Sequence, residues 1–67
     1  MRISKKKLSI AMATSGFSFI DLSKESGVSR TTLSYINNGK SCRPDVAGKI
    51  ARALSMPVEQ LIEQEAP

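Results

Sequence analysis

A chain of 67 residues can form one small domain, and an aromatic content of 4% cannot fill the interior of a large sheet. The composition therefore favours an all-α fold, a single domain over residues 1–67 with its core at about residues 4–64. With no histidine and one cysteine, Cys42, the sequence lacks the parts of a zinc site, an intramolecular disulfide or a nucleophile and base, so we expect no metal, no cofactor and no enzyme activity. No apolar run comes near the length of a membrane span, about 18 residues, and we expect a cytoplasmic protein with no membrane partner.

Charge is distributed unevenly along the chain. Residues 1–52 hold all ten Lys and Arg and three acidic residues, a net charge of +7, whereas residues 53–67 hold three glutamates, Glu59, Glu63 and Glu65. One interpretation is a basic body that faces a polyanion, with an acidic end turned away from it. The other is a solvated surface that serves solubility, and charge alone supports the two equally.

Glycine, proline and capping residues divide the chain into five short helical segments, and no alternation of period two indicates a strand. The first segment runs over about residues 4–15 and stops at Gly16. Three lysines, at residues 5–7, occupy its first turn, where the helix dipole disfavours cations. We therefore expect either fraying of this turn or compensation by an external anion.

The second and third segments begin at serines that can cap a helix. Ser18 can accept a hydrogen bond from the backbone N–H of Asp21, and the second segment ends at Gly27. The third segment begins with Ser29 as its N-cap and stops at Gly39. Its flanking apolar residues are at the spacing of a hydrophobic staple: Val28 and Leu33.

The last two segments begin at prolines. Pro44 stands at a first helical position, which tolerates a missing N–H, and Asp45 complements the dipole of that fourth helix. Pro57 starts a fifth helix. Apolar residues at helical spacing predict the buried faces of both: Val46, Ile50, Ala51 and Leu54 in the fourth, and Val58, Leu61 and Ile62 in the fifth.

The third segment has an outer face of short polar residues. On a helical wheel Leu33 and Ile36 centre the buried face, and Thr31 lies almost opposite. Ordinary exposed helices carry Glu, Lys and Gln because those residues favour helix, whereas short side chains that donate and accept hydrogen bonds suit a helix lying in the DNA major groove. We therefore predict DNA base contacts from this face, against the alternative of a plain solvent-exposed helix. The residues concerned are Arg30, Thr31, Ser34 and Tyr35.

Phosphate contacts need different groups, namely backbone N–H groups at helix starts, small polar side chains and cations at the rim. The sequence offers such groups on both sides of the third helix. The predicted phosphate-contacting residues are Ser18, Ser29, Asn38, Lys40, Ser41 and Arg43.

The run FSFIDLSKESGVSRTTLSYINNGK at residues 17–40, followed by P-x-x-x-x-K-I-A-x-A-L at residues 44–54, resembles the phage repressor and Cro type of helix-turn-helix domain, the XRE family. The resemblance spans roughly residues 8–62. It implies a compact five-helix, lambda-repressor-like DNA-binding domain in which helices two and three form the helix-turn-helix and the third enters the major groove. The family's base-reading positions fall on Arg30, Thr31, Thr32, Ser34 and Tyr35, and its phosphate-binding asparagine falls on Asn38.

Three positions depart from the family pattern. Phe19 stands where many members start the second helix with a glutamine that braces a recognition residue. Met12 and Asn37 stand where many members pair an arginine with a glutamate. Because both partners are missing together, we expect a substituted core contact and not a lone buried charge.

The resulting hypothesis is a sequence-specific double-stranded DNA-binding regulator, a repressor that acts as a homodimer with its third helices one DNA turn, about 34 Å, apart. No small-molecule ligand is evident. The alternative is a protein-binding module, such as an antitoxin or adaptor with the same fold. The predicted dimer surface comprises Met56, Val58, Leu61 and Ile62, although the sequence somewhat favours completion of the core as the role of Leu61 and Ile62.

Overall fold

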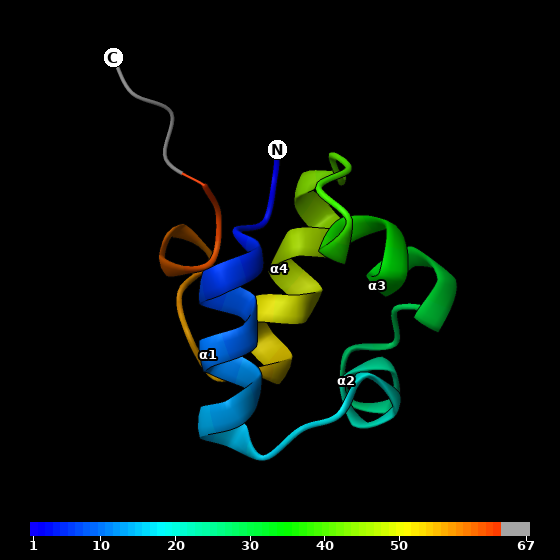
Figure 1. Cartoon of the computed structure of the whole chain (residues 1–67), viewed down its shortest axis with the longest axis vertical. Helices are drawn as coiled ribbons and strands as arrows, with labels where there is room; N and C mark the ends of the chain where they lie inside the picture. Colours follow the sequence, from blue (N-terminus) through cyan, green and yellow to red (C-terminus); the bar gives the residue numbers. More distant parts are fainter. Residues whose placement is uncertain (64–67) are drawn as a thin grey trace.

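The computed structural model describes residues 1–63, and every regular element in that range is a helix (Figure 1). Residues 64–67, which include Glu65 of the acidic end and the predicted core boundary at residue 64, lie outside the described residues. The elements are α1 (Lys5–Ser15), α2 (Phe19–Ser26), α3 (Arg30–Asn37), α4 (Pro44–Ala53) and a 3₁₀-helix, η1 (Val58–Gln60). None of these helices is long and apolar enough to cross a membrane.

Local capping sets the ends of the first three helices, as the sequence predicts. The hydroxyl of Ser4 accepts a hydrogen bond from the N–H of Lys7 at 3.3 Å, so α1 starts within the lysine run. Ser18 and Asp21 form a complete capping box at the start of α2. Gly16, with φ of 71°, adopts the left-handed conformation that ends α1.

The lysine-rich first turn of α1 is helical, so the first of the two alternatives, fraying, is wrong, and compensation by an external anion stays a prediction. The Nζ atom of Lys7 donates to the backbone oxygen of Ile62 at 3.4 Å. One of the three lysines is therefore hydrogen-bonded to a backbone carbonyl near the other end of the chain. This contact crosses 55 residues of sequence, which explains why no local pattern revealed it.

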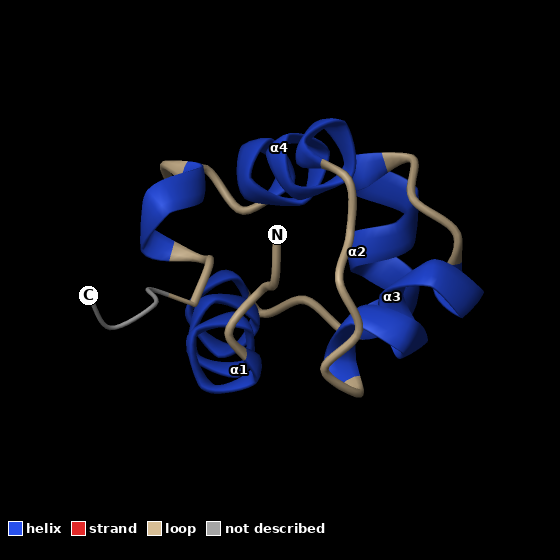
Figure 2. Cartoon of the chain, turned by 90° about the horizontal axis from the view of Figure 1, so that it is seen from above, coloured by secondary structure: helices blue, strands red, loops and turns tan. Residues whose placement is uncertain are grey.

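Helix α4 lies in the centre of the molecule, with α1 and η1 on one side of it and α2 and α3 on the other (Figures 1 and 2). The core fills the space that these helices enclose. Helix α4 packs against both α2 and η1. Ala47, which the sequence did not assign to the core, is fully buried, while the predicted Val46 is only partly buried. The buried residues form one cluster: Ile3, Leu8, Leu22, Val28, Leu33, Ile36, Ala47, Ile50, Ala51, Leu54 and Leu61.

The fifth segment is a single 3₁₀ turn, and the prediction of a fifth α-helix is wrong: residues 1–63 contain four α-helices. The N-terminal segment pairs with this part of the chain instead. Ile3 forms an antiparallel bridge with Ile62, the N–H of Ser4 donates to the Leu61 oxygen at 2.9 Å, and the N–H of Glu63 donates to the Arg2 oxygen at 2.9 Å. Backbone groups that would continue a helix are used in this pairing.

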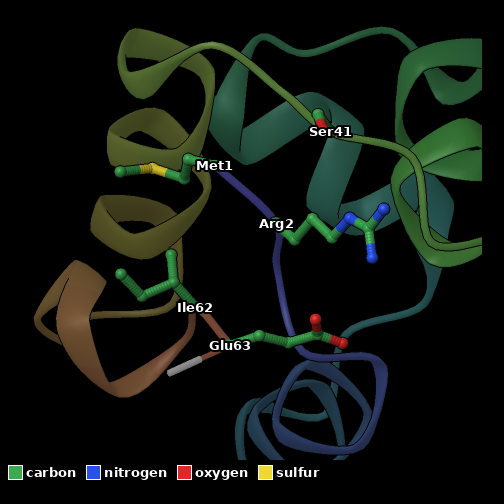
Figure 3. A pocket seen from close by; sticks show the side chains of 5 residues that line it. All are labelled: Met1, Arg2, Ser41, Ile62 and Glu63. Atoms are coloured by element: carbon green, nitrogen blue, oxygen red, sulfur yellow. The ribbon is translucent and has the colours of Figure 1, made fainter. Parts of the chain in front are cut away.

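The same N-terminal segment also holds the loop between α3 and α4. The N–H of Cys42 donates to the Met1 oxygen at 2.8 Å. Figure 3 shows Met1 and Arg2 passing between Ser41 on one side and Ile62 with Glu63 on the other. The bond from Cys42 to Met1 holds the loop next to the C-terminal end of α3. The polar and basic side chains of the loop, Lys40, Ser41 and Arg43, therefore lie close to that helix.

Candidate functional site

Helix α3 presents the face that the helical wheel predicted. Leu33 and Ile36 are buried in the core, while Thr31, Ser34 and Tyr35 are exposed. Arg30, the first helical residue, is exposed as well. The short polar face of α3 therefore meets solvent and makes no contribution to the core of the protomer.

The start of α3 is held by a serine and a threonine. The Ser29 hydroxyl accepts from the N–H of Thr32 at 3.2 Å and donates to the hydroxyl oxygen of Thr32 at 2.9 Å. Thr32 is half-buried, and its hydroxyl keeps its own proton for one further hydrogen bond. Both side chains take part in capping, and their predicted DNA contacts stay predictions.

The exposed face of α3 joins the first turn of α2 in an open hollow, called here the α2–α3 hollow. Two large side chains of α2 and five residues of α3 meet in it, and among the described residues no acid lines it. Four of the predicted base-contacting residues are thus brought together. The lining residues are Phe19, Ile20, Arg30, Thr31, Ser34, Tyr35 and Asn37.

A second hollow, the loop hollow, lies between α3, the α3–α4 loop and the start of α4. Tyr35 lines both hollows, so they adjoin on one surface. Three predicted phosphate-contacting residues lie in the loop hollow beside the C-terminal half of α3. The lining residues are Thr32, Tyr35, Ile36, Lys40, Ser41, Cys42, Arg43 and Val46.

Arg43 is paired within the protomer. Its Nε atom lies 3.4 Å from Oδ1 of Asp45, with side-chain exposures of 80% and 56% for the two residues. A second contact joins Nη2 of Arg43 to Oδ2 of Asp45 at 3.5 Å. An ion pair this exposed is weak and salt-sensitive, so an incoming phosphate can compete with the carboxylate.

Ser18 forms the capping box of α2, and its predicted phosphate contact stays a prediction. Its hydroxyl donates to Oδ2 of Asp21 at 3.0 Å, and its backbone N–H donates to the same oxygen at 3.0 Å. The backbone N–H of Ser18, and then its hydroxyl, lower the pKa of the Asp21 carboxyl, which keeps that group ionised. What the first turn of α2 can offer a phosphate is its free backbone N–H groups, because the serine side chain is engaged.

The remaining predicted phosphate-contacting residue, Asn38, is the C-cap of α3 and is exposed. Its backbone N–H bonds to the oxygens of Ser34 and Tyr35 at 3.1 Å. The following Gly39 has φ of 89°, a conformation that glycine adopts readily, and turns the chain toward Lys40. This turn brings the basic loop back alongside α3.

Cys42 is half-buried in the same loop, and burial raises the pKa of its thiol. The thiol is therefore protonated near neutral pH, the less reactive form. Its backbone N–H, bonded to the Met1 oxygen, is the group that positions the loop. We assign Cys42 a structural role.

The predicted dimer surface is smaller than expected. Leu61 is fully buried in the protomer core, which removes it from the surface available to a second copy. Met56, Val58 and Ile62 are partly buried and pack against the same core. They retain some exposed surface, and the dimer assignment for these three stays a prediction.

Sequence reasoning missed three residues of the α2–α3 hollow, namely Phe19, Ile20 and Asn37. Ile20 is two positions before the buried Leu22, which places it on the opposite face of α2, and this spacing was the available signal. Phe19 and the half-buried Asn37 are identified in the sequence only as departures from the family pattern. At the other departure, Met12 packs against the core.

Comparison with protein families matches residues 7–67 to a model described as Cro/C1-type HTH DNA-binding domain. The match includes most of α1 and all of α2, α3, α4 and η1. Comparison with curated proteins and with solved structures gave no match.

Proposed function

Because this chain belongs to the family of Cro/C1-type helix-turn-helix DNA-binding domains, we propose that it is a transcriptional repressor that binds a two-fold symmetric operator as a homodimer. DNA binding follows from the family. The repressor activity, the homodimer and the individual contact residues are the proposal.

The observation that carries the proposal is the continuous surface formed by the α2–α3 hollow and the loop hollow. Tyr35 joins a region of short polar side chains to a region that holds Lys40 and Arg43. Base edges in the major groove require the first kind of chemistry, and the flanking phosphates require the second. Both kinds lie on one side of α3 and its following loop.

The two regions have separate tasks. Arg30 can donate two hydrogen bonds to the O6 and N7 atoms of guanine, and Thr31 and Ser34 can bond to several bases. Lys40 and Arg43 neutralise phosphates and release counterions, which supplies affinity without sequence preference. Specificity therefore depends on α3, and the salt dependence of binding depends on the loop.

A dimer is favoured because one α3 of eight residues reaches only a few base pairs. Two copies related by a two-fold axis double the contacts and select a symmetric site. The partly buried apolar residues Met56, Val58 and Ile62 are the proposed contact between copies. A bound dimer covers its operator and sterically excludes other proteins from it, which is the simplest route to repression.

The test begins with selection of bound sequences from a random duplex pool, followed by titrations of the selected duplex and of a scrambled control over a salt series. Lys40→Ala should weaken binding to both duplexes alike and reduce the slope of log affinity against log salt by about 0.9. Thr31→Ala or Arg30→Ala should weaken mainly the selected duplex, by about 1–3 kcal/mol.

Three outcomes would contradict the proposal. Equal effects of both classes of variant on selected and scrambled DNA would show that α3 does not read bases. A selected sequence without two-fold symmetry, bound by one copy of the protein, would contradict the homodimer. Absence of salt-dependent binding to any duplex would favour a protein-binding module with the same fold.

A further inference from the structure

Exposed apolar side chains are concentrated in the α2–α3 hollow. The described residues include five large hydrophobic side chains that are exposed, and three of them line this hollow. They are Phe19, Ile20 and Tyr35, with 37%, 48% and 59% of their surface exposed. Such gathering of apolar side chains on a small domain indicates a contact surface.

The first two of these side chains project from backbone that is fixed by the capping box of α2. Ser18 and Asp21 bond to each other through both backbone and side chain, which fixes the backbone of the residues between them. Phe19 and Ile20 are those residues. The core receives its contact from α2 through Leu22, which is fully buried, so Phe19 and Ile20 are not required to fill the interior.

The charge around the hollow indicates what covers it. No acidic residue lines it within residues 1–63, Arg30 does, and Lys40 and Arg43 lie in the adjoining loop hollow. This arrangement suits a polyanion that also presents an apolar group. In the major groove of DNA the apolar group on a base edge is the C5-methyl of thymine.

We propose that Phe19 and Ile20, with Tyr35 beside them, contact thymine methyl groups at base pairs adjoining those that α3 reads through its polar residues. This inference rests on the proposed DNA-binding function and adds the chemistry of further positions in the operator. The departure from the family pattern at Phe19 would then change which bases the protein selects. A position where many members place a polar brace contributes apolar selection of thymine in this protein.

The test replaces each thymine of the selected duplex singly with deoxyuridine, which removes the methyl group and leaves the hydrogen-bonding edges intact. Affinity is measured by fluorescence anisotropy at one fixed salt concentration. Burial of one methyl predicts that binding by the unmodified protein weakens about fourfold at the contacted thymines. In Phe19→Ala or Ile20→Ala the same replacement should have no effect at the thymine that the lost side chain contacted.

The matched control is Ile10→Ala, which truncates another exposed isoleucine, on α1 and outside the hollow. Whatever this change does to overall affinity, the ratio of affinities for thymine and deoxyuridine duplexes should be unchanged. Circular dichroism and urea unfolding of each variant confirm that the fold is retained. The measurement on the unmodified protein requires no variant at all.

Failure of this inference is distinguishable from failure of the proposed function. Sequence-selective binding that is indifferent to every thymine methyl would overturn the inference and leave the regulator proposal intact. A methyl effect that persists in both Phe19→Ala and Ile20→Ala would also overturn it, because other side chains would then be reading the methyl. No binding to any duplex would overturn both.

Discussion

Removal of the carboxylate next to Arg43 should strengthen DNA binding. Arg43 and Asp45 form an exposed ion pair, with 3.4 Å between Nε and Oδ1, at the edge of the loop hollow. Asp45→Asn keeps the size and planarity of the side chain and removes its charge. The change frees Arg43 for a phosphate and also removes a negative charge that would repel that phosphate.

The effect on binding can be estimated from Coulomb's law. A carboxylate roughly 7 Å from a bound phosphate costs about 0.6 kcal/mol in water, which corresponds to about a threefold change in affinity. Salt screens this repulsion, so the gain should be largest at low ionic strength and should disappear at high salt. A newly available Arg43 contact should steepen the slope of log affinity against log salt by up to about 0.9.

The effect on stability should be small. An exposed ion pair contributes about 0–1 kcal/mol to the free energy of unfolding. Asp45 also lies in the first turn of α4, where a negative charge interacts favourably with the helix dipole by about 0.3–1 kcal/mol. Asp45→Asn should therefore remain folded and bind DNA more tightly while being slightly less stable, two changes of opposite sign in one variant.

The assay is fluorescence anisotropy with the selected duplex over a salt series, together with urea unfolding. The control is Glu59→Gln, which makes the same change in net charge on η1, on the opposite side of the molecule from α3 (Figure 1). If Asp45→Asn leaves affinity and slope unchanged, or if Glu59→Gln has an equal effect, the loop hollow does not face the phosphates and the reasoning is wrong.

Three further predictions concern single positions. Ser55 follows α4 with φ of 56°, in the left-handed region, so Ser55→Gly should raise the free energy of unfolding by about 1 kcal/mol in urea titrations. The control, Ser9→Gly within α1, should lower the free energy of unfolding by a similar amount. Equal effects of the two changes would contradict the backbone conformation assigned to Ser55. The backbone N–H of Ser18, and then its hydroxyl, lower the pKa of Asp21 in the folded protein. The ionised Asp21 carboxylate therefore stabilises the fold fully above its unfolded-state pKa of about 3.9, and this contribution is lost as the pH falls through the lower folded-state pKa. Thermal melts should show this loss in the acid range, and Asp21→Asn should show a flatter acid limb; an unchanged limb would mean that the capping box does not form. Cys42→Ser should leave DNA affinity unchanged in anisotropy titrations, because the backbone N–H that bonds to the Met1 oxygen is kept and the thiol, which packs against the core, is replaced by a group of similar size. A marked loss would indicate a redox role for the thiol.

The sequence by itself determined where the first three α-helices begin and end, and where the fourth begins. Ser18, Ser29 and Gly27 act on backbone groups within a few residues of themselves, and capping hydrogen bonds of this kind follow from residue type and spacing. The direction of α3 was equally available, because Leu33 and Ile36 define a buried stripe at helical spacing. The short polar side chains on the opposite face of α3 then led to the prediction that this face contacts DNA bases.

Only the tertiary structure decided how these helices combine into a surface. The first turn of α2 lies beside α3, which places Phe19 and Ile20 next to Thr31, and the bond from Cys42 to Met1 positions the basic loop. The pairing of Ile3 with Ile62 likewise replaced the fifth α-helix by one 3₁₀ turn and accompanied the burial of Leu61 in the core. The physical reason is the range of the interactions: capping and amphipathic spacing act within a turn or two of chain, whereas these contacts join segments whose proximity no local pattern encodes.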